Sequence, residues 1–83
     1  MVSMEEIKTK IRRIILNIAE DMEIEEETVT DDAHLINDLG MDSMALLEIL
    51  ANIEKEFGVK IPESEFPMLV SVNASVAIVK KYI

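Results

Sequence analysis

The sequence contains no cysteine and no tryptophan, and its 83 residues include only two glycines, two prolines, two phenylalanines and one tyrosine. Without cysteine the chain can form neither a disulfide nor a thiolate metal site, and nothing in it indicates an oxidising compartment. Hydrophobic residues still make up 49 % of the chain, although aromatic residues make up only 4 %. Aliphatic side chains and methionine must therefore fill the core, which favours helices packed on helices.

Long hydrophobic runs are missing as well, since no apolar segment approaches the roughly 18 residues that span a membrane. The first six residues, Met1–Glu6, are acidic and lack the basic-then-apolar order of a secretion signal. We therefore expect a cytoplasmic protein with no membrane partner. A chain of this length forms one small domain, residues 1–83, with a single core and no deep enzyme cleft.

Basic residues are absent from the middle of the chain. There are 17 acidic and 8 basic residues, which give a formal net charge of −9, and no lysine or arginine lies between Ile14 and Glu54. This charge argues against a nucleic-acid partner, because phosphate binding needs the opposite sign. An acidic surface either serves solubility or steers the protein toward basic patches on partner proteins. The composition leaves both interpretations open.

An amphipathic helix is predicted at the start of the chain. Ser3 and Glu6 have the spacing of a capping box, in which each side chain accepts a hydrogen bond from the backbone of the other residue. An apolar stripe at helical spacing follows and ends near residues 19–22; its members are Ile7, Ile11, Ile14, Ile15 and Ile18.

The next segment, residues 23–42, is predicted to be a long acidic loop. Such a loop in a small domain is unusual and tends to be ordered or functional. We expect His34, the only histidine, to be a surface residue of this loop. Four apolar residues are predicted to pin the loop onto the core: Val29, Leu35, Ile36 and Leu39.

A second helix is predicted from about Ser43 to Phe57, and Gly58 is placed to end it. Its polar stripe consists of Glu48, Asn52, Lys55 and Glu56. Its apolar arc, which is wide enough to contact more than one other helix, consists of Leu46, Leu47, Leu50, Ile53 and Phe57.

Two further helices are predicted near the end of the chain. A short one begins with Pro62 at its first position, and Pro67 limits its length. Ser71 is placed to cap the last helix, whose apolar residues are Val72, Val76, Val79 and Ile83. The expected fold is therefore all-α, a small four-helix bundle with a long ordered loop between helices 1 and 2 and a short third helix.

Ser43 lies at the N-terminus of the second predicted helix and is a candidate functional residue. Self-contained catalysis is not indicated, because a serine nucleophile needs a nearby base and the G-x-S-x-G elbow is absent. No segment has the ligand order of a calcium loop. One possibility is that Asp42 or Ser43 only caps the helix. The other is that another enzyme modifies Ser43, since a helix N-terminus favours a phosphodiester.

The segment Leu39–Met44, L-G-M-D-S-M, resembles the phosphopantetheine attachment motif of acyl carrier proteins, usually L-G-x-D-S-L. The resemblance covers essentially the whole chain, because residues 26–30, 57–62 and the Ser71 helix also fall where that family has similar segments. It implies a non-enzymatic four-helix carrier. Ser43 would hold a 4'-phosphopantetheine arm transferred from coenzyme A, the arm would carry acyl groups as thioesters, and Asp42 would assist recognition by the transferase.

The resemblance also implies surfaces and partners. The docking residues would be Met44, Leu47, Glu48 and Glu54, and a short acyl chain would be enclosed by Leu50, Ile61 and Phe66. Several of these positions have a simpler explanation, because apolar residues of a helix belong to the core and Glu48 can simply be solvated. The partners would be a phosphopantetheinyl transferase, acyl transferases or ligases, and ketosynthases, all meeting a monomeric carrier through basic patches.

Three departures from the family pattern concern the pathway. Ala45 stands where carriers of primary fatty acid synthesis usually have aspartate, Lys55 interrupts an acidic stretch, and residues 66–70 are apolar with a proline. These departures favour a specialised, polyketide-like carrier over a housekeeping carrier of fatty acid synthesis. An unmodified acidic helical adaptor is a further alternative. A metal buffer built on the acidic loop lacks ligand geometry.

Overall fold

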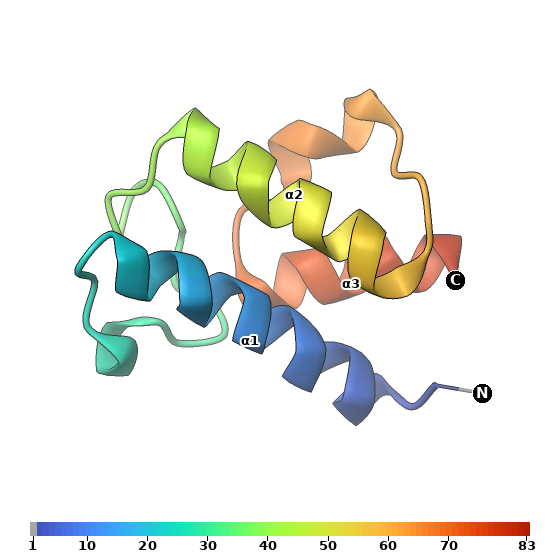
Figure 1. Ribbon diagram of the computed structural model, residues 1–83, viewed down its shortest axis with the longest axis horizontal. Helices are drawn as coiled ribbons and strands as arrows, with labels where there is room; N and C mark the ends of the chain where they lie inside the picture. The colour runs from blue at the N-terminus through green and yellow to red at the C-terminus, as the bar shows by residue number, and fades with distance from the viewer. Residues whose placement is uncertain (1) are drawn as a thin grey trace.

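The computed structural model describes residues 2–83 as an all-helical bundle (Figure 1). Three α-helices, α1 (Met4–Asp21), α2 (Ser43–Phe57) and α3 (Val72–Tyr82), alternate with two short 3-10 helices, η1 (Glu26–Thr28) and η2 (Glu63–Met68). The predicted all-α bundle is confirmed, and its short third helix is the 3-10 segment η2. None of the helices in residues 2–83 has the length and the apolar run needed to cross a membrane.

Helix α1 starts at the predicted capping box. The backbone N–H of Glu6 donates to the Ser3 hydroxyl over 3.1 Å, and the Glu6 carboxylate accepts from the backbone N–H of Ser3. Its buried face contacts both α2 and α3, and it consists of Ile7, Ile11, Ile15, Ile18 and Ala19. Ile14, also expected on this face, is only half-buried. The helix runs antiparallel to α2, so its C-terminal end lies beside the N-terminus of α2 (Figure 1).

Helix α2 has the predicted bounds, but its buried face is rotated from the expected arc. Gly58 ends the helix in the left-handed conformation, at φ 64°. The buried residues are Ala45, Leu46, Ile49 and Ile53. The prediction that Leu47 belongs to the core arc is wrong, because 48 % of Leu47 is exposed. At 3.6 residues per turn, Leu47 lies roughly 200° around the helix from the fully buried Ile49.

Three of the four apolar residues predicted to anchor the loop between η1 and α2 pack on the core, and the fourth does not. Val29 and Leu35 are fully buried, and Leu39 packs partly against the core. Ile36 was predicted to be an anchor, but it is 40 % exposed. The Leu35 N–H donates to the Val70 carbonyl over 2.8 Å, which ties this part of the loop to the segment before α3. Sequence reasoning missed Met41, which is only 2 % exposed.

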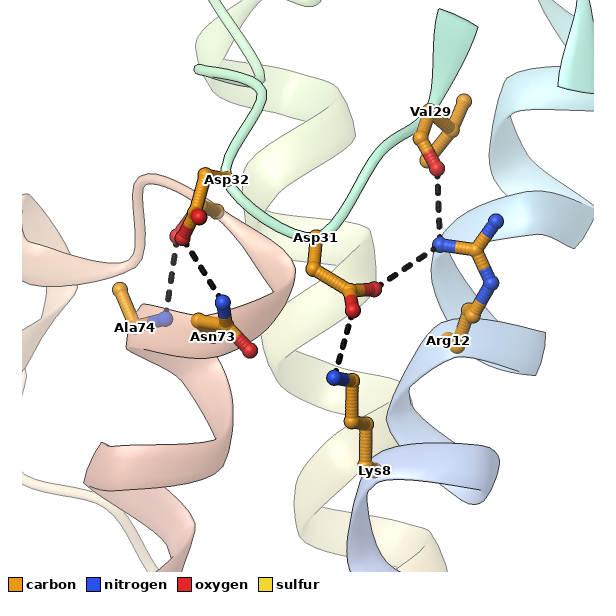
Figure 2. Close-up of polar contacts among 8 residues, drawn as sticks. Lys8, Arg12, Val29, Asp31, Asp32, Asn73 and Ala74 are labelled. Carbon is orange, nitrogen blue, oxygen red and sulfur yellow. Dashed lines mark hydrogen bonds and ion pairs between the residues drawn. The ribbon is translucent and has the colours of Figure 1, made fainter. Parts of the chain in front are cut away.

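Polar contacts around Asp31 tie this loop to α1 (Figure 2). The Asp31 carboxylate pairs with Lys8 over 2.5 Å and with Arg12 over 3.2 Å. Arg12 also donates to the Val29 carbonyl over 2.7 Å. The hydrogen bond from Lys8, with a further contribution from the Arg12 guanidinium, holds the pKa of Asp31 below its ordinary value of 3.8. The loop is therefore ordered by charge as well as by apolar burial.

We expect Asp31→Asn to lower the free energy of unfolding by about 0.5 kcal/mol at pH 7, because these ion pairs are partly exposed to solvent. The charged carboxylate is the form that pairs. Its contribution is thus present above the unfolded pKa and is lost as the pH falls through the lowered folded pKa. Urea unfolding of both proteins at pH 7 and pH 3 measures this. A stability difference that persists unchanged at pH 3 would contradict the ion-pair explanation.

The last part of the chain differs from prediction in three details. Pro62 lies just before η2 rather than at its first position, and Pro67 lies inside η2, which continues to Met68. Ser71 caps α3 as expected, by accepting from the Ala74 N–H over 3.0 Å. Ile83, predicted to continue the apolar stripe, lies beyond the helix end and is 51 % exposed.

Candidate functional site

The chain enters α2 through a well-anchored turn. Gly40 adopts the left-handed conformation at φ 76°, which favours glycine, and its N–H donates to the Ile36 carbonyl over 2.9 Å. Met41 is buried, and its N–H donates to the Leu35 carbonyl over 2.9 Å. These two hydrogen bonds and the burial of Met41 fix the backbone directly before α2.

Asp42 caps α2, and Ser43 does not take part in the cap. Asp42 is the N-cap of α2, and its carboxylate Oδ1 accepts from the Ala45 N–H over 2.9 Å. Ser43 is the first helical residue and is exposed. The capping interpretation therefore applies to Asp42, and the hydroxyl of Ser43 is not needed for it.

The surroundings of Ser43 fit a phosphodiester. Backbone N–H groups in the first turn of a helix lack carbonyl partners within the helix and favour an anion there. The nearby Asp42 carboxylate opposes a second negative charge, but both residues are exposed, so water and salt screen the repulsion. The exposed serine also leaves an attached group free to extend into solvent.

Three of the four expected docking residues lie on the exposed surface of α2. Met44 is 73 % exposed, Leu47 is 48 % exposed, and Glu48 is exposed. Glu54 differs, because it is half-buried and its Oε2 accepts from the Ile61 N–H over 2.8 Å. Glu54 thereby fixes the segment that follows Gly58, a role that sequence reasoning missed because the two residues belong to different elements.

We expect Glu54→Ala to lower the free energy of unfolding by about 1–2 kcal/mol, since it leaves the N–H of the buried Ile61 without its acceptor. The matched control is Glu48→Ala on the same helix, which removes an exposed carboxylate and should change stability by less than about 0.5 kcal/mol. Urea unfolding followed by circular dichroism measures both. Equal effects of the two substitutions would refute the special role of Glu54.

The residues expected to enclose an acyl chain all pack at the core. Ile61 is 5 % exposed, and Leu50 and Phe66 are partly buried against the core cluster. Ile61 is held in place by Glu54, and Phe66 lies in η2. Leu50 lies in α2, Phe66 lies in η2, and Ile61 lies in the segment that joins these two elements.

His34 has a structural role in the loop. The residue is half-buried rather than fully at the surface, and its Nδ1 accepts from the N–H groups of Ile36 and Asn37 over 3.3 and 3.0 Å. The His34 N–H donates to the Asp38 carboxylate over 2.8 Å. Among residues 2–83, no group of three or more histidine and acidic side chains is arranged to hold a metal ion.

Comparison of the sequence with known proteins identifies its family. The sequence matches the family described as phosphopantetheine attachment site over residues 12–79, which includes the Asp42–Ser43 turn and all of α2. It is also 37 % identical over 81 residues to the acyl carrier protein of Thermotoga maritima, covering 98 % of this chain and 96 % of that protein. The chain belongs to the acyl carrier protein family.

Two other relatives support this assignment. The acyl carrier protein of Lactobacillus acidophilus is 34 % identical over 80 residues, covering 96 % of each chain. The acyl carrier protein AcpXL of Rhizobium etli is 53 % identical over 45 residues, which cover 54 % of this chain and 49 % of that protein. Members of this family are carriers rather than catalysts, and their prosthetic group is phosphopantetheine. Proteins of this family interact with biosynthetic enzymes in general.

Proposed function

We propose that residues 1–83 form a single cytoplasmic carrier domain in which Ser43 holds the phosphopantetheine arm. The observation that supports this most directly is the position of Ser43 as the exposed first residue of α2. The neighbouring Asp42 already satisfies the cap, so the serine hydroxyl is available for modification. Because the chain contains no cysteine, the arm supplies the thiol on which acyl groups are held as thioesters.

Asp42 is proposed to have a role in transferase recognition in addition to capping α2. Its cap hydrogen bond holds the carboxylate beside Ser43, where a phosphopantetheinyl transferase can recognise it. The cap also fixes the backbone from which the Ser43 hydroxyl projects. Asp42 is therefore proposed as a positioning and recognition residue for the transfer of the arm from coenzyme A.

Met44, Leu47 and Glu48 are proposed as the docking residues for the transferase and for the enzymes that load or extend the acyl group. Their exposure supports this, since large apolar side chains at 73 % and 48 % exposure beside a reactive group favour a contact surface. Acyl transferases or ligases and ketosynthases would approach through basic patches, because acidic residues surround Ser43. Glu54 was expected to dock as well, but its contact with Ile61 indicates a mainly structural contribution.

The acyl cargo and the pathway are proposed from the apolar residues near η2 and from the departures of this sequence from the pattern of fatty acid synthesis carriers. We infer that Leu50, Ile61 and Phe66 enclose a short acyl chain between α2 and η2. Met68 is 60 % exposed at the end of η2, and Ala45 stands at the position where the resemblance to carriers of primary fatty acid synthesis implies aspartate. These features support a specialised, polyketide-like carrier. Malonyl loading and elongation of the modified protein by ordinary fatty acid synthesis enzymes at housekeeping rates would instead support a housekeeping carrier.

The test of the proposed function is the intact mass of the wild-type protein after incubation with coenzyme A, magnesium and a broad-specificity phosphopantetheinyl transferase. We expect a gain equal to one phosphopantetheine arm, and fragmentation should locate it on Ser43. A folded protein that gains no mass with this transferase or with one from its own source would favour the unmodified adaptor. An arm on another serine would overturn the site while leaving the carrier function in place.

A further inference from the structure

Three polar side chains join η2 to the C-terminal end of α3. Glu65 lies in η2, and its side chain is only 13 % exposed. Its Oε2 accepts a hydrogen bond from the Tyr82 hydroxyl over 2.8 Å and pairs with the Lys81 ammonium over 2.5 Å. The hydrogen bond from Lys81, with a further one from Tyr82, holds the pKa of the Glu65 carboxyl below its ordinary value of 4.5. We call these three residues the Glu65 cluster.

Helix η2 has few other anchors. None of the residues Glu63–Met68 is fully buried, whereas each of the three α-helices buries at least four of its residues. Phe66 is only partly buried against the core cluster, and Pro67 has no backbone N–H to donate within the helix. Helix η2 contacts α3, and the Glu65 cluster adds the polar side-chain contacts between these two elements. The position of η2 therefore depends strongly on this cluster.

The acyl site proposed above is closely packed in this structure. Ile61, directly before Pro62, is 5 % exposed, and Leu69, directly after η2, is 1 % exposed. Phe66, the neighbour of Glu65 in η2, packs against the same core cluster. Protein cores contain few voids larger than a water molecule, so an acyl chain that enters beside Phe66 has to displace one of the elements around it. Helix η2 buries the fewest residues and is the element that moves at the lowest cost.

Resting on the proposed function, we propose that Glu65, Tyr82 and Lys81 select the acyl chains that enter the site, because they hold η2 against α3 until a chain is long enough to displace it. A longer chain buries more apolar surface, and this burial offsets the loss of the Glu65 cluster. An acetyl group buries too little and leaves the cluster intact, whereas a hexanoyl chain separates η2 from α3. Tyr82 and Lys81 are therefore positioning residues, which act through η2 and do not contact the acyl chain.

A simpler explanation is that the Glu65 cluster only stabilises the end of α3. A contact that is present in every form of the protein stabilises the unmodified and the loaded protein equally, because independent contributions add. A contact that the acyl chain breaks stabilises only the forms in which the chain has not entered. The two explanations therefore differ in the melting temperature that they predict for a variant without the contact once a long chain is attached.

The test is thermal unfolding of the full-length protein, followed by circular dichroism, in three forms. One form is unmodified, and the others are loaded by the transferase from acetyl-coenzyme A or hexanoyl-coenzyme A. Tyr82→Phe removes the hydroxyl and keeps the ring, which packs partly on the core. We expect it to lower the Tm of the unmodified and acetyl forms by about 2–5 °C and the Tm of the hexanoyl form by less than about 1 °C. Glu65→Gln should follow the same pattern.

The matched control is Glu63→Gln, which removes an exposed carboxylate from the same helix and should leave the Tm of all three forms unchanged. A Tm difference between Tyr82→Phe and the wild-type protein that persists in the hexanoyl form would overturn this inference and leave Ser43 as the attachment residue. Equal Tm values for the two unmodified proteins would also overturn it, because the cluster would then hold nothing. Failure of the wild-type protein to accept an arm from any donor would remove both this inference and the proposed function.

Discussion

Ser43→Ala is expected to gain no phosphopantetheine under conditions in which the wild-type protein is converted completely. The reason is chemical, because alanine has no hydroxyl to form the phosphodiester bond. The fold should be unaffected: Asp42 supplies the cap through the Ala45 N–H, and alanine is the best helix former. Intact mass measures the modification, and urea unfolding should show a stability change below about 0.5 kcal/mol.

The matched control for this substitution is Ser64→Ala. Ser64 is exposed in η2, whereas Ser3 and Ser71 cap helices and Ser75 is buried. Ser64→Ala should be loaded as fully as the wild-type protein. Loading of Ser43→Ala would show that the arm is attached elsewhere. Loss of loading in both variants would point to a general effect on the protein rather than to the loss of one hydroxyl.

Leu35→Ala is expected to have the largest effect on stability, about 3 kcal/mol, because it creates a cavity at a fully buried side chain. The same residue donates to the Val70 carbonyl and accepts from the Met41 N–H, so its position affects both the loop and the turn before Ser43. A domain of this size has a total stability of about 4–12 kcal/mol. The substitution therefore removes a large share, which urea unfolding followed by circular dichroism would measure.

Ile36→Ala is the neighbouring control. Ile36 is 40 % exposed, so its truncation should cost less than about 1 kcal/mol. The two positions are adjacent and equally hydrophobic in the sequence, and only the structure separates them. A loss of similar size for both would mean that Leu35 does not hold the loop in the way that its burial indicates. Retained loading of the weakened Leu35→Ala protein would show that the turn before Ser43 tolerates a mobile loop.

The candidate site could be predicted only in part, because its residues depend on contacts of different range. The L-G-x-D-S pattern is local and is enough to indicate Ser43. Asp42 and Ser43 were both possible caps in the sequence, and the hydrogen bond from Ala45 assigns the cap to Asp42. Glu54 was expected at the surface, but Ile61 lies seven residues away across Gly58 and binds its carboxylate.

The sequence by itself determined the class of the fold, the starts of α1 and α3, the bounds of α2 and the family motif. These features follow from local hydrogen bonds and from helical periodicity, which act over a few residues. The tertiary structure decided which apolar residues are buried, as Leu35 and Ile36 show, and which charges hold the loop, as Arg12 shows through its contacts with Val29 and Asp31. Those contacts join residues 17 and 19 positions apart. Their partners are set by the packing of whole helices, which no local pattern specifies.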